Sequence, residues 1–224
     1  MPDPLTDSLA TRRPPTPQLT DSGVVAILRA RSAEHIPRAA EALVDAGITC
    51  LEVTLTIPGA LAAITALSRQ LPARVAVGAG SVTTAGDAAA AVDAGAAFLV
   101  SPAVCGDVLS YATAAGIPCY PGALTPTEVL TAWRSGATAV KVFPASVGGP
   151  AYLKSLRDPL PDIPLVPTGG ITVQDAPAYL AAGAVAVGLG TPLLGGALDD
   201  GDVTALGGRA RRLLAAVAAS RQGR

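Results

Sequence analysis

Short apolar segments alternate with helical segments along the whole chain, and this alternation predicts a single-domain α/β fold, a (β/α)8 TIM barrel over residues 23–220. Two observations support the prediction. A glycine preceded by Ala or Ser ends one helical pattern after another, and an apolar run follows each glycine. The runs are apolar throughout, which is typical of parallel strands that are buried on both faces.

The recurring glycines define the expected repeat. Each of them stands where a residue of left-handed conformation commonly ends a helix. They are Gly47, Gly95, Gly116, Gly136 and Gly183. Their spacings agree with a strand–helix unit of roughly 20 to 24 residues if the two long spacings are double units. An open doubly wound sheet would share this alternation, but about eight regular units without a glycine-rich dinucleotide motif after the first strand favour a closed barrel.

The expected strands are the continuous apolar runs between these helices. In chain order they are 24–28, 50–55, 75–79, 98–101, 118–120, 139–143, 165–167 and 185–189.

The starts of several helices carry capping residues. Segment 125–128 (Thr-Pro-Thr-Glu) combines an N-cap, a proline at the first helical position and a capping-box glutamate. Thr84 and Thr172 stand three residues before Asp87 and Asp175. Strand and helix signals therefore alternate along the chain.

Composition narrows the possible partners. The formal net charge is −1 and no run of Lys or Arg could follow a phosphate backbone, so we expect no nucleic acid partner. Three cysteines without C-x-x-C spacing indicate neither a disulfide framework nor a zinc site and suit a reducing cytoplasm. The proline-rich residues 1–22 have no apolar signal-peptide core and are expected to form a loosely held arm. No segment is expected to span a membrane.

Barrel enzymes place reacting groups at the carboxyl ends of their strands, and Lys141 is the clearest candidate there. Of 16 lysine and arginine residues only Lys141 and Lys154 are lysine, and Lys141 lies within Ala-Val-Lys-Val-Phe-Pro. Burial disfavours an ammonium ion and gives the neutral amine that attacks a ketone, whereas arginine cannot lose its proton. We therefore expect a Schiff-base nucleophile, with a lysine in a static ion pair as the alternative.

Glu52 is a second ionisable residue in an apolar strand, within Cys-Leu-Glu-Val-Thr-Leu. A buried carboxylate is costly unless it is paired or functional, and Lys141 is its obvious partner. Beside a Schiff-base lysine, Glu52 could move protons during imine and enamine formation. A static ion pair with Lys141 is again the alternative.

Glycine-rich segments end the last two strands, at 167–170 (Pro-Thr-Gly-Gly) and 188–191 (Gly-Leu-Gly-Thr). Their backbone N–H groups could hold a phosphate, as this part of a barrel commonly does, and Thr191 could add a hydroxyl. Glycines that only permit a tight turn are the alternative.

Arg29 ends the first strand and could hold a carboxylate with two parallel hydrogen bonds, although a solvated side chain at this position is equally consistent with the sequence. No chemistry is assigned to His35, Trp133 or Tyr152.

Six motifs in the same order resemble a known family over about residues 23 to 210. They are 51–54 (Leu-Glu-Val-Thr), 78–81 (Gly-Ala-Gly-Ser), 101–102 (Ser-Pro), 121–122 (Pro-Gly), 141–144 (Lys-Val-Phe-Pro) and 167–170 (Pro-Thr-Gly-Gly). The family is that of the bacterial 2-keto-3-deoxy-6-phosphogluconate (KDPG) aldolases, which includes 4-hydroxy-2-oxoglutarate (KHG) aldolase and the 2-keto-3-deoxy-6-phosphogalactonate (KDPGal) enzymes.

The resemblance implies a class I aldolase on a homotrimeric barrel. Lys141 would form the Schiff base and Glu52 would be the general acid/base, with no metal and no organic cofactor. The small-molecule substrate would be KDPG, cleaved to pyruvate and glyceraldehyde 3-phosphate, with KHG or KDPGal as alternatives.

Substrate contacts follow from the same resemblance together with the strand ends. The expected substrate-binding residues are Arg29, Thr54, Thr56, Gly80, Ser81, Pro102, Phe143, Thr168, Gly169, Gly170, Gly190 and Thr191. Ser81 matches a position that usually carries Thr and helps to hold the pyruvate carboxylate. Some members have an arginine where this chain has Thr56. Other members with Thr there have an arginine that ends strand one, which Arg29 matches.

Three other functions compete with this one. A metal-dependent pyruvate aldolase would need acids on neighbouring strand ends, where Glu52 is the only acid available. A phosphate-sugar isomerase or lyase could use Glu52 as a base and Lys141 as an electrostatic helper. The barrel could also be a ligand-binding module without catalysis.

Overall fold

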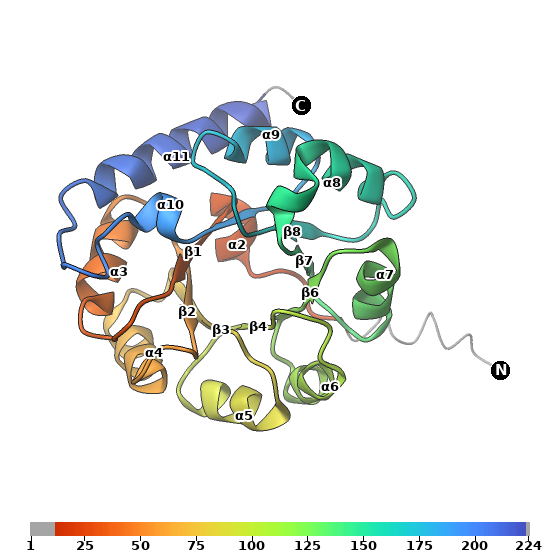
Figure 1. Ribbon diagram of the computed structural model, residues 1–224. Coiled ribbons are helices and arrows are strands. Elements are labelled where there is room, and N and C mark those ends of the chain that lie inside the picture. Colours follow the sequence, from red (N-terminus) through yellow and green to blue (C-terminus); the bar gives the residue numbers. More distant parts are fainter. Residues whose placement is uncertain (1–11, 223–224) are drawn as a thin grey trace.

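The computed structural model describes residues 12–222, which form a closed (β/α)8 barrel with parallel strands surrounded by helices (Figure 1). The strands are β1 (Val24–Leu28), β2 (Cys50–Thr54), β3 (Ala76–Gly80), β4 (Leu99–Val100), β5 (Cys119–Tyr120), β6 (Gly122–Ala123), β7 (Val140–Val142), β8 (Leu165–Pro167) and β9 (Val187–Leu189). The predicted fold class and the eight predicted strand positions are confirmed.

Two sheets join to close the barrel. One has the order β5-β4-β3-β2-β1-β9 and the other β6-β7-β8, and a parallel bridge between Thr168 and Gly188 joins β8 to β9. The second junction is Pro121, which divides the fifth barrel strand into β5 and β6 because proline has no N–H to donate. The Lys141 N–H still donates to the Pro121 carbonyl at 2.9 Å, so the barrel wall continues across this break.

The helices that surround the strands end as expected. They are α3 (Ile36–Asp45), α4 (Ala60–Gln70), α5 (Ala85–Asp93), α6 (Gly106–Ala115), α7 (Pro126–Arg134), α8 (Gly149–Arg157), α9 (Ala176–Ala181), α10 (Thr191–Leu194) and α11 (Leu206–Gln222), with a 3₁₀ turn η1 (Ala145–Val147). The five predicted glycines that follow helices all have φ between 66° and 103°, which glycine adopts without a steric penalty. Across residues 12–222, no helix combines the length and apolarity needed to cross a membrane.

Two of the predicted capping pairs form capping boxes. Thr84 with Asp87 begins α5, and Thr125 with Glu128 begins α7. Thr172 and Asp175 also exchange hydrogen bonds, but α9 begins only at Ala176, so a helix start at Thr172 was wrong. The reason is Pro177, which cannot donate the backbone hydrogen bond that an earlier start would require.

Side chains fill the inside of the barrel. This inner cluster comprises Leu19, Val25, Ile27, Cys50, Ala76, Phe98, Val100, Tyr120, Ala139, Val166 and Ala186. The Phe98 and Tyr120 ring centroids lie 5.4 Å apart. A Cβ at Gly78 would lie 2.3 Å from the Phe98 ring, so glycine is needed there to admit the aromatic side chain. The barrel is therefore a packed core and not a channel.

A short helix, α2 (Pro17–Ser22), closes the amino end of the barrel. Its Leu19 is fully buried in the inner cluster, and the Tyr120 hydroxyl accepts a hydrogen bond from the Thr16 N–H at 3.2 Å. The expectation of a loosely held arm over residues 1–22 is therefore wrong for residues 12–22, because one leucine within this proline-rich segment packs into the barrel. Residues 1–11 of the expected arm lie outside the described residues.

We expect Leu19→Ala to lower the free energy of unfolding by about 2–5 kcal/mol, because it removes a fully buried side chain from the barrel interior. Chemical denaturation would measure the change. Val147→Ala is the control, since Val147 is 69% exposed and its truncation should change stability by less than about 0.5 kcal/mol. Equal effects of the two substitutions would show that Leu19 does not stabilise the barrel.

A pH-dependent contribution comes from the capping box of α7. Hydrogen bonds from the N–H groups of Thr125 and Leu124, at 2.8 and 2.9 Å, hold the pKa of Glu128 below its ordinary value. The ionised carboxylate therefore stabilises the fold above its ordinary pKa, and this contribution is lost as pH falls through the lowered folded-state pKa.

We expect Glu128→Gln to lower the free energy of unfolding at neutral pH by on the order of 0.5 kcal/mol, a small effect because the carboxylate is exposed and screened by solvent. At a pH below the folded-state pKa the two proteins should have equal stability. Denaturant titrations at the two pH values would measure the difference, and a difference that does not depend on pH would contradict the assignment.

Candidate active site

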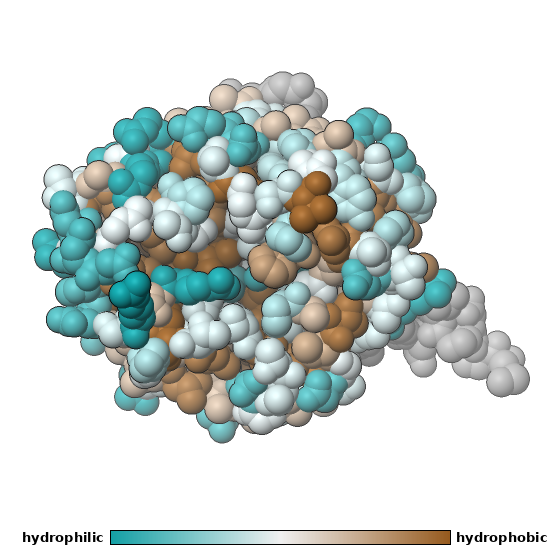
Figure 2. Space-filling view, viewed as in Figure 1, coloured by the Kyte–Doolittle hydropathy of each residue, from teal (hydrophilic) through white to brown (hydrophobic). Residues whose placement is uncertain are grey.

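A cavity of about 170 Å³ opens at the carboxyl ends of the strands. It is lined by Ile27, Arg29, Lys141, Phe143, Thr168, Gly169, Gly170, Gly190, Thr191 and Pro192. Figure 2 shows this face of the molecule, where hydrophobic side chains lie between more polar ones. The structure thus brings together the predicted residues at the ends of the first, sixth, seventh and eighth barrel strands.

Two residues of the lining were not predicted. Ile27 lies two residues before Arg29. Because alternate residues of a strand face the same side, strand alternation could have identified Ile27 as facing the same side as Arg29. Pro192 follows Thr191 directly, but nothing in the sequence distinguishes it from any other proline in the first turn of a helix.

Lys141 and Glu52 face each other inside the barrel wall. Lys141 lies in β7 and Glu52 in β2, and they are 7% and 2% exposed. The Lys141 Nζ and Glu52 Oε1 atoms are 4.0 Å apart, too far for a hydrogen bond. Glu52 Oε1 is buried and has no hydrogen-bond partner among the described residues. A group with a polar hydrogen that is placed between the two would satisfy an otherwise costly carboxylate oxygen.

Gly80 makes room for the Glu52 side chain. A Cβ built at Gly80 would lie 2.0 Å from Glu52 Oε1 and 2.6 Å from its carboxyl carbon. Gly80 does not line the cavity, so its predicted contact with substrate remains a prediction. Gly188 is comparable, since its Cβ would lie 2.4 Å from the hydroxyl oxygen of the buried Thr168.

Four further predicted residues lie outside the cavity lining, at the ends of β2, β3 and β4. Thr54 is fully buried, and its hydroxyl is 3.1 Å from that of the exposed Thr56. Ser81 has φ of 60°, a conformation that costs a non-glycine residue on the order of 1 kcal/mol and that clusters at functional sites. Pro102 is exposed. Their contacts with substrate also remain predictions.

The glycine-rich strand ends present free backbone donors. The hydrogen bonds formed by residues 12–222 include none donated by the N–H groups of Gly169, Gly170, Gly190 or Thr191. Gly169 and Gly170 have φ of 90° and 71°, and a Cβ on either would lie within 3 Å of Phe143 or Ser146. Glycine therefore permits both the turn and the close approach of the loop after β7.

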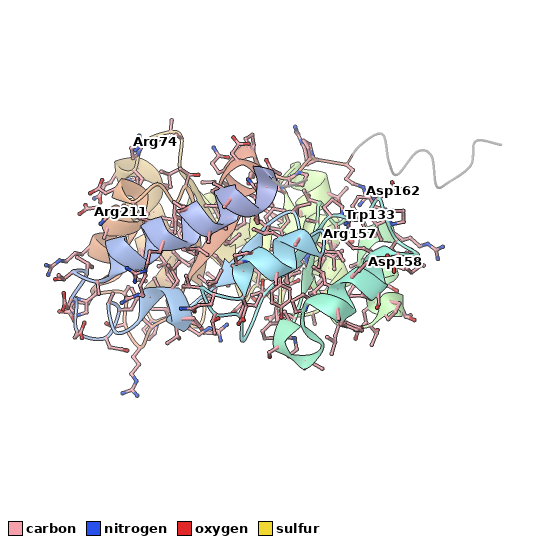
Figure 3. All side chains as sticks on the ribbon, turned by 90° about the horizontal axis from the view of Figure 1, so that it is seen from above. Arg74, Trp133, Arg157, Asp158, Asp162 and Arg211 are labelled. Carbon is pink, nitrogen blue, oxygen red and sulfur yellow. The ribbon has the colours of Figure 1, made fainter. Side chains whose placement is uncertain are left out.

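A larger hollow of about 740 Å³ lies at the opposite end of the barrel, where α2 meets α11. Figure 3 labels Arg74, one of the residues that line it. Its lining has Asp21, Arg74 and Arg221 but no lysine, cysteine or histidine, so the smaller cavity is the candidate for catalysis. In the described part of the chain, His, Cys, Asp and Glu side chains form no group of three or more that could hold a metal ion.

Residues 16–207 match the protein family described as KDPG and KHG aldolase. The chain belongs to this family. The 2-dehydro-3-deoxy-phosphogluconate aldolase (KDPG aldolase) of Pseudomonas aeruginosa is 40% identical over 171 residues, which is 76% of this chain and 77% of that protein. A probable 2-dehydro-3-deoxy-6-phosphogalactonate (KDPGal) aldolase of Rhizobium meliloti is 35% identical over 181 residues, 80% of this chain and 85% of that protein.

Solved structures of KDPG aldolases share the fold. One from Legionella pneumophila, with pyruvate captured at low pH as a covalent carbinolamine intermediate, has a TM-score of 0.81 and 29% identity, covering 89% of this chain and 98% of that chain. The membership in the KDPG and KHG aldolase family makes this protein a carbon–carbon lyase.

We expect Gly80→Ala to lower the kcat of this aldolase by at least about 100-fold, because the new methyl group displaces the Glu52 carboxylate from Lys141. Steady-state assay of aldol cleavage would measure it. Gly86→Ala is the matched control, since the nearest atom to its Cβ would be 3.7 Å away in the exposed start of α5. Full activity of Gly80→Ala would show that the position of Glu52 is not critical.

Proposed function

We propose that this aldolase cleaves KDPG to pyruvate and glyceraldehyde 3-phosphate through an imine on Lys141. The observation that supports the proposal best is the buried Lys141–Glu52 pair, held 4.0 Å apart beside a cavity with free backbone donors. An amine and a carboxylate at this separation can act together on one substrate without first breaking a hydrogen bond between themselves.

The first step is formation of the imine. The lone pair of the Lys141 Nζ attacks C2 of the 2-keto acid and gives a carbinolamine, which loses its hydroxyl as water to leave a protonated imine. Glu52, the acid within reach of the Lys141 Nζ, carries the protons that this exchange requires. Water leaves with the former keto oxygen, so the imine is the only new bond to the enzyme.

Cleavage follows from the protonated imine. Glu52, directly or through water, removes the proton of the C4 hydroxyl as the C3–C4 bond breaks, and the bond electrons pass to the imine nitrogen. C4 leaves as the aldehyde carbon of glyceraldehyde 3-phosphate. The remaining enamine takes a proton at C3, and hydrolysis releases pyruvate and the free amine.

Arg29 is proposed to hold the substrate carboxylate. It lines the cavity from the end of β1, and β1 pairs with β2, which precedes Thr56. The guanidinium therefore approaches the site from the strand next to the position where some family members have their arginine. The half-buried Ser81 and the exposed Thr56 and Pro102 are proposed to complete the pyruvate end. Phe143 packs beside the lysine, with its ring centroid 5.2 Å from the Lys141 Nζ.

The phosphate is proposed to bind at the other end of the cavity. Within residues 12–222 the N–H groups of Gly169, Gly170, Gly190 and Thr191 donate no hydrogen bond, and such groups are suited to an anion with several acceptor oxygens. This favours KDPG or KDPGal over KHG, which carries a carboxylate in place of the phosphate. KDPG and KDPGal differ at C4, and the KDPGal relative makes that epimer the second candidate.

We also propose a homotrimer that works in the cytoplasm. The homotrimer follows the family resemblance, and the cytoplasm suits the free thiols of Cys50, Cys105 and Cys119.

We expect pyruvate and borohydride together to add a stable mass to this protein at Lys141, because borohydride reduces an imine to a secondary amine. Intact mass and peptide mapping would measure it. Lys154→Arg, which removes the other lysine, is the control that should still form the adduct, whereas Lys141→Arg should form none.

A folded, active enzyme without an adduct would overturn the imine and favour a metal-dependent aldolase or an isomerase. If the adduct forms, the substrate is identified by measuring kcat/KM for KDPG, for its C4 epimer KDPGal and for KHG, and taking the compound with the highest value. A preference for KHG would contradict the proposed phosphate site.

A further inference from the structure

Arg209 contacts a short helix that borders the cavity. It lies in α11, and its Nε and one terminal nitrogen donate to the carbonyls of Leu193 and Leu194, each at 2.6 Å. These are the last two residues of α10, whose first residue, Thr191, lines the cavity. A planar guanidinium thus holds the end of α10 that lies away from the cavity.

The single turn of α10 links Arg209 to the cavity. The Gly190 carbonyl accepts from the N–H groups of Leu193 and Leu194 at 2.9 and 3.0 Å, and the Gly195 N–H donates to the Thr191 carbonyl at 2.7 Å. A helix this short is not stable by its own hydrogen bonds. The orientation of the Gly190 and Thr191 N–H groups therefore depends on what holds the other end of the turn.

The residues on both sides of the contact between Arg209 and α10 are restricted in conformation. Gly195 has φ of 59° and ψ of −133°, a conformation closed to other residues, and a Cβ there would lie 2.7 Å from the guanidinium. Arg209 itself is fixed because Leu206, Ala210 and Leu213 of α11 are fully buried.

The buried side chains of α10 do not replace this contact. Leu193 and Leu194 are 0% and 2% exposed, which fixes the depth of the turn in the core. The Leu193 carbonyl, however, accepts from no donor other than Arg209 within residues 12–222. Side-chain packing alone would leave this carbonyl without a hydrogen-bond donor. It would also leave the direction of the helix axis without a polar contact to fix it.

We infer that Arg209 is a positioning residue that selects for phosphorylated substrates, an inference that rests on the proposed function. By holding the carboxyl end of α10, Arg209 aims the Gly190 and Thr191 N–H groups at the phosphate. Lys141 and Glu52 lie on other strands, so imine formation does not depend on Arg209.

The test compares two aldehydes on the same enzyme preparation. Condensation of pyruvate with D-glyceraldehyde 3-phosphate and with unphosphorylated D-glyceraldehyde gives a ratio of kcat/KM values, from which any loss of folded protein cancels. We expect Arg209→Gln to lower this ratio between about 10- and 100-fold, with the value for glyceraldehyde and the rate of borohydride trapping with pyruvate unchanged.

Two further variants complete the design. Arg209→Lys keeps the charge but cannot donate to both carbonyls in one plane. Its kcat/KM ratio should therefore fall between those of the unsubstituted enzyme and Arg209→Gln. This variant also serves as the test if Arg209→Gln does not fold. Arg211→Gln is the matched control, since Arg211 is exposed on the same helix (Figure 3) and its ratio should equal that of the unsubstituted enzyme.

An unchanged ratio in both Arg209 variants, or an equal loss with both aldehydes, would overturn the inference. Failure of the proposed function gives a different result, because the unsubstituted enzyme would then form no borohydride adduct with pyruvate at all.

Discussion

The separation of Lys141 and Glu52 is the constraint on which the rest of the site depends. Each is an ionisable group inside an apolar barrel, where the loss of hydration costs several kcal/mol per ion. Closer approach would lock them in a salt bridge, and wider separation would leave both charges unpaired. The 4.0 Å distance is held by the parallel ladders of β2 and β7 and by the missing side chain of Gly80. Rigid strands, rather than flexible loops, therefore set the chemistry.

Bulk is distributed unevenly along the barrel axis. The amino end is filled by Leu19, Phe98 and Tyr120, whereas glycines at the carboxyl end make room for the side chains of Glu52 and Thr168. The buried polar groups therefore lie at the carboxyl end, next to the cavity. Their burial lowers the free energy of unfolding, and apolar burial at the amino end offsets that loss.

The sequence predicted those features that have a local signature. Strands followed from apolar runs, helix ends from glycine, and Lys141 and Glu52 from polarity within apolar strands. Features that depend on distant contacts were missed or wrong. The packing of α2 depends on one leucine in a proline-rich segment, the spatial role of Gly80 depends on a side chain of the neighbouring strand, and the contact of Arg209 with α10 appears only once α11 is folded against it. None of these has a periodic pattern.

The break at Pro121 has a mechanical consequence. Lys141 and the Gly169–Gly170 turn belong to the β6-β7-β8 sheet or its end, whereas Glu52 and Arg29 belong to the larger sheet or its end. The two sheets join along two seams, one at Pro121 in the fifth barrel strand and one between β8 and β9, which includes the bridge between Thr168 and Gly188. Lys141 and Glu52, the proposed nucleophile and base, therefore lie on opposite sides of these two seams, and stiff seams would keep the spacing of the two groups constant through a catalytic cycle.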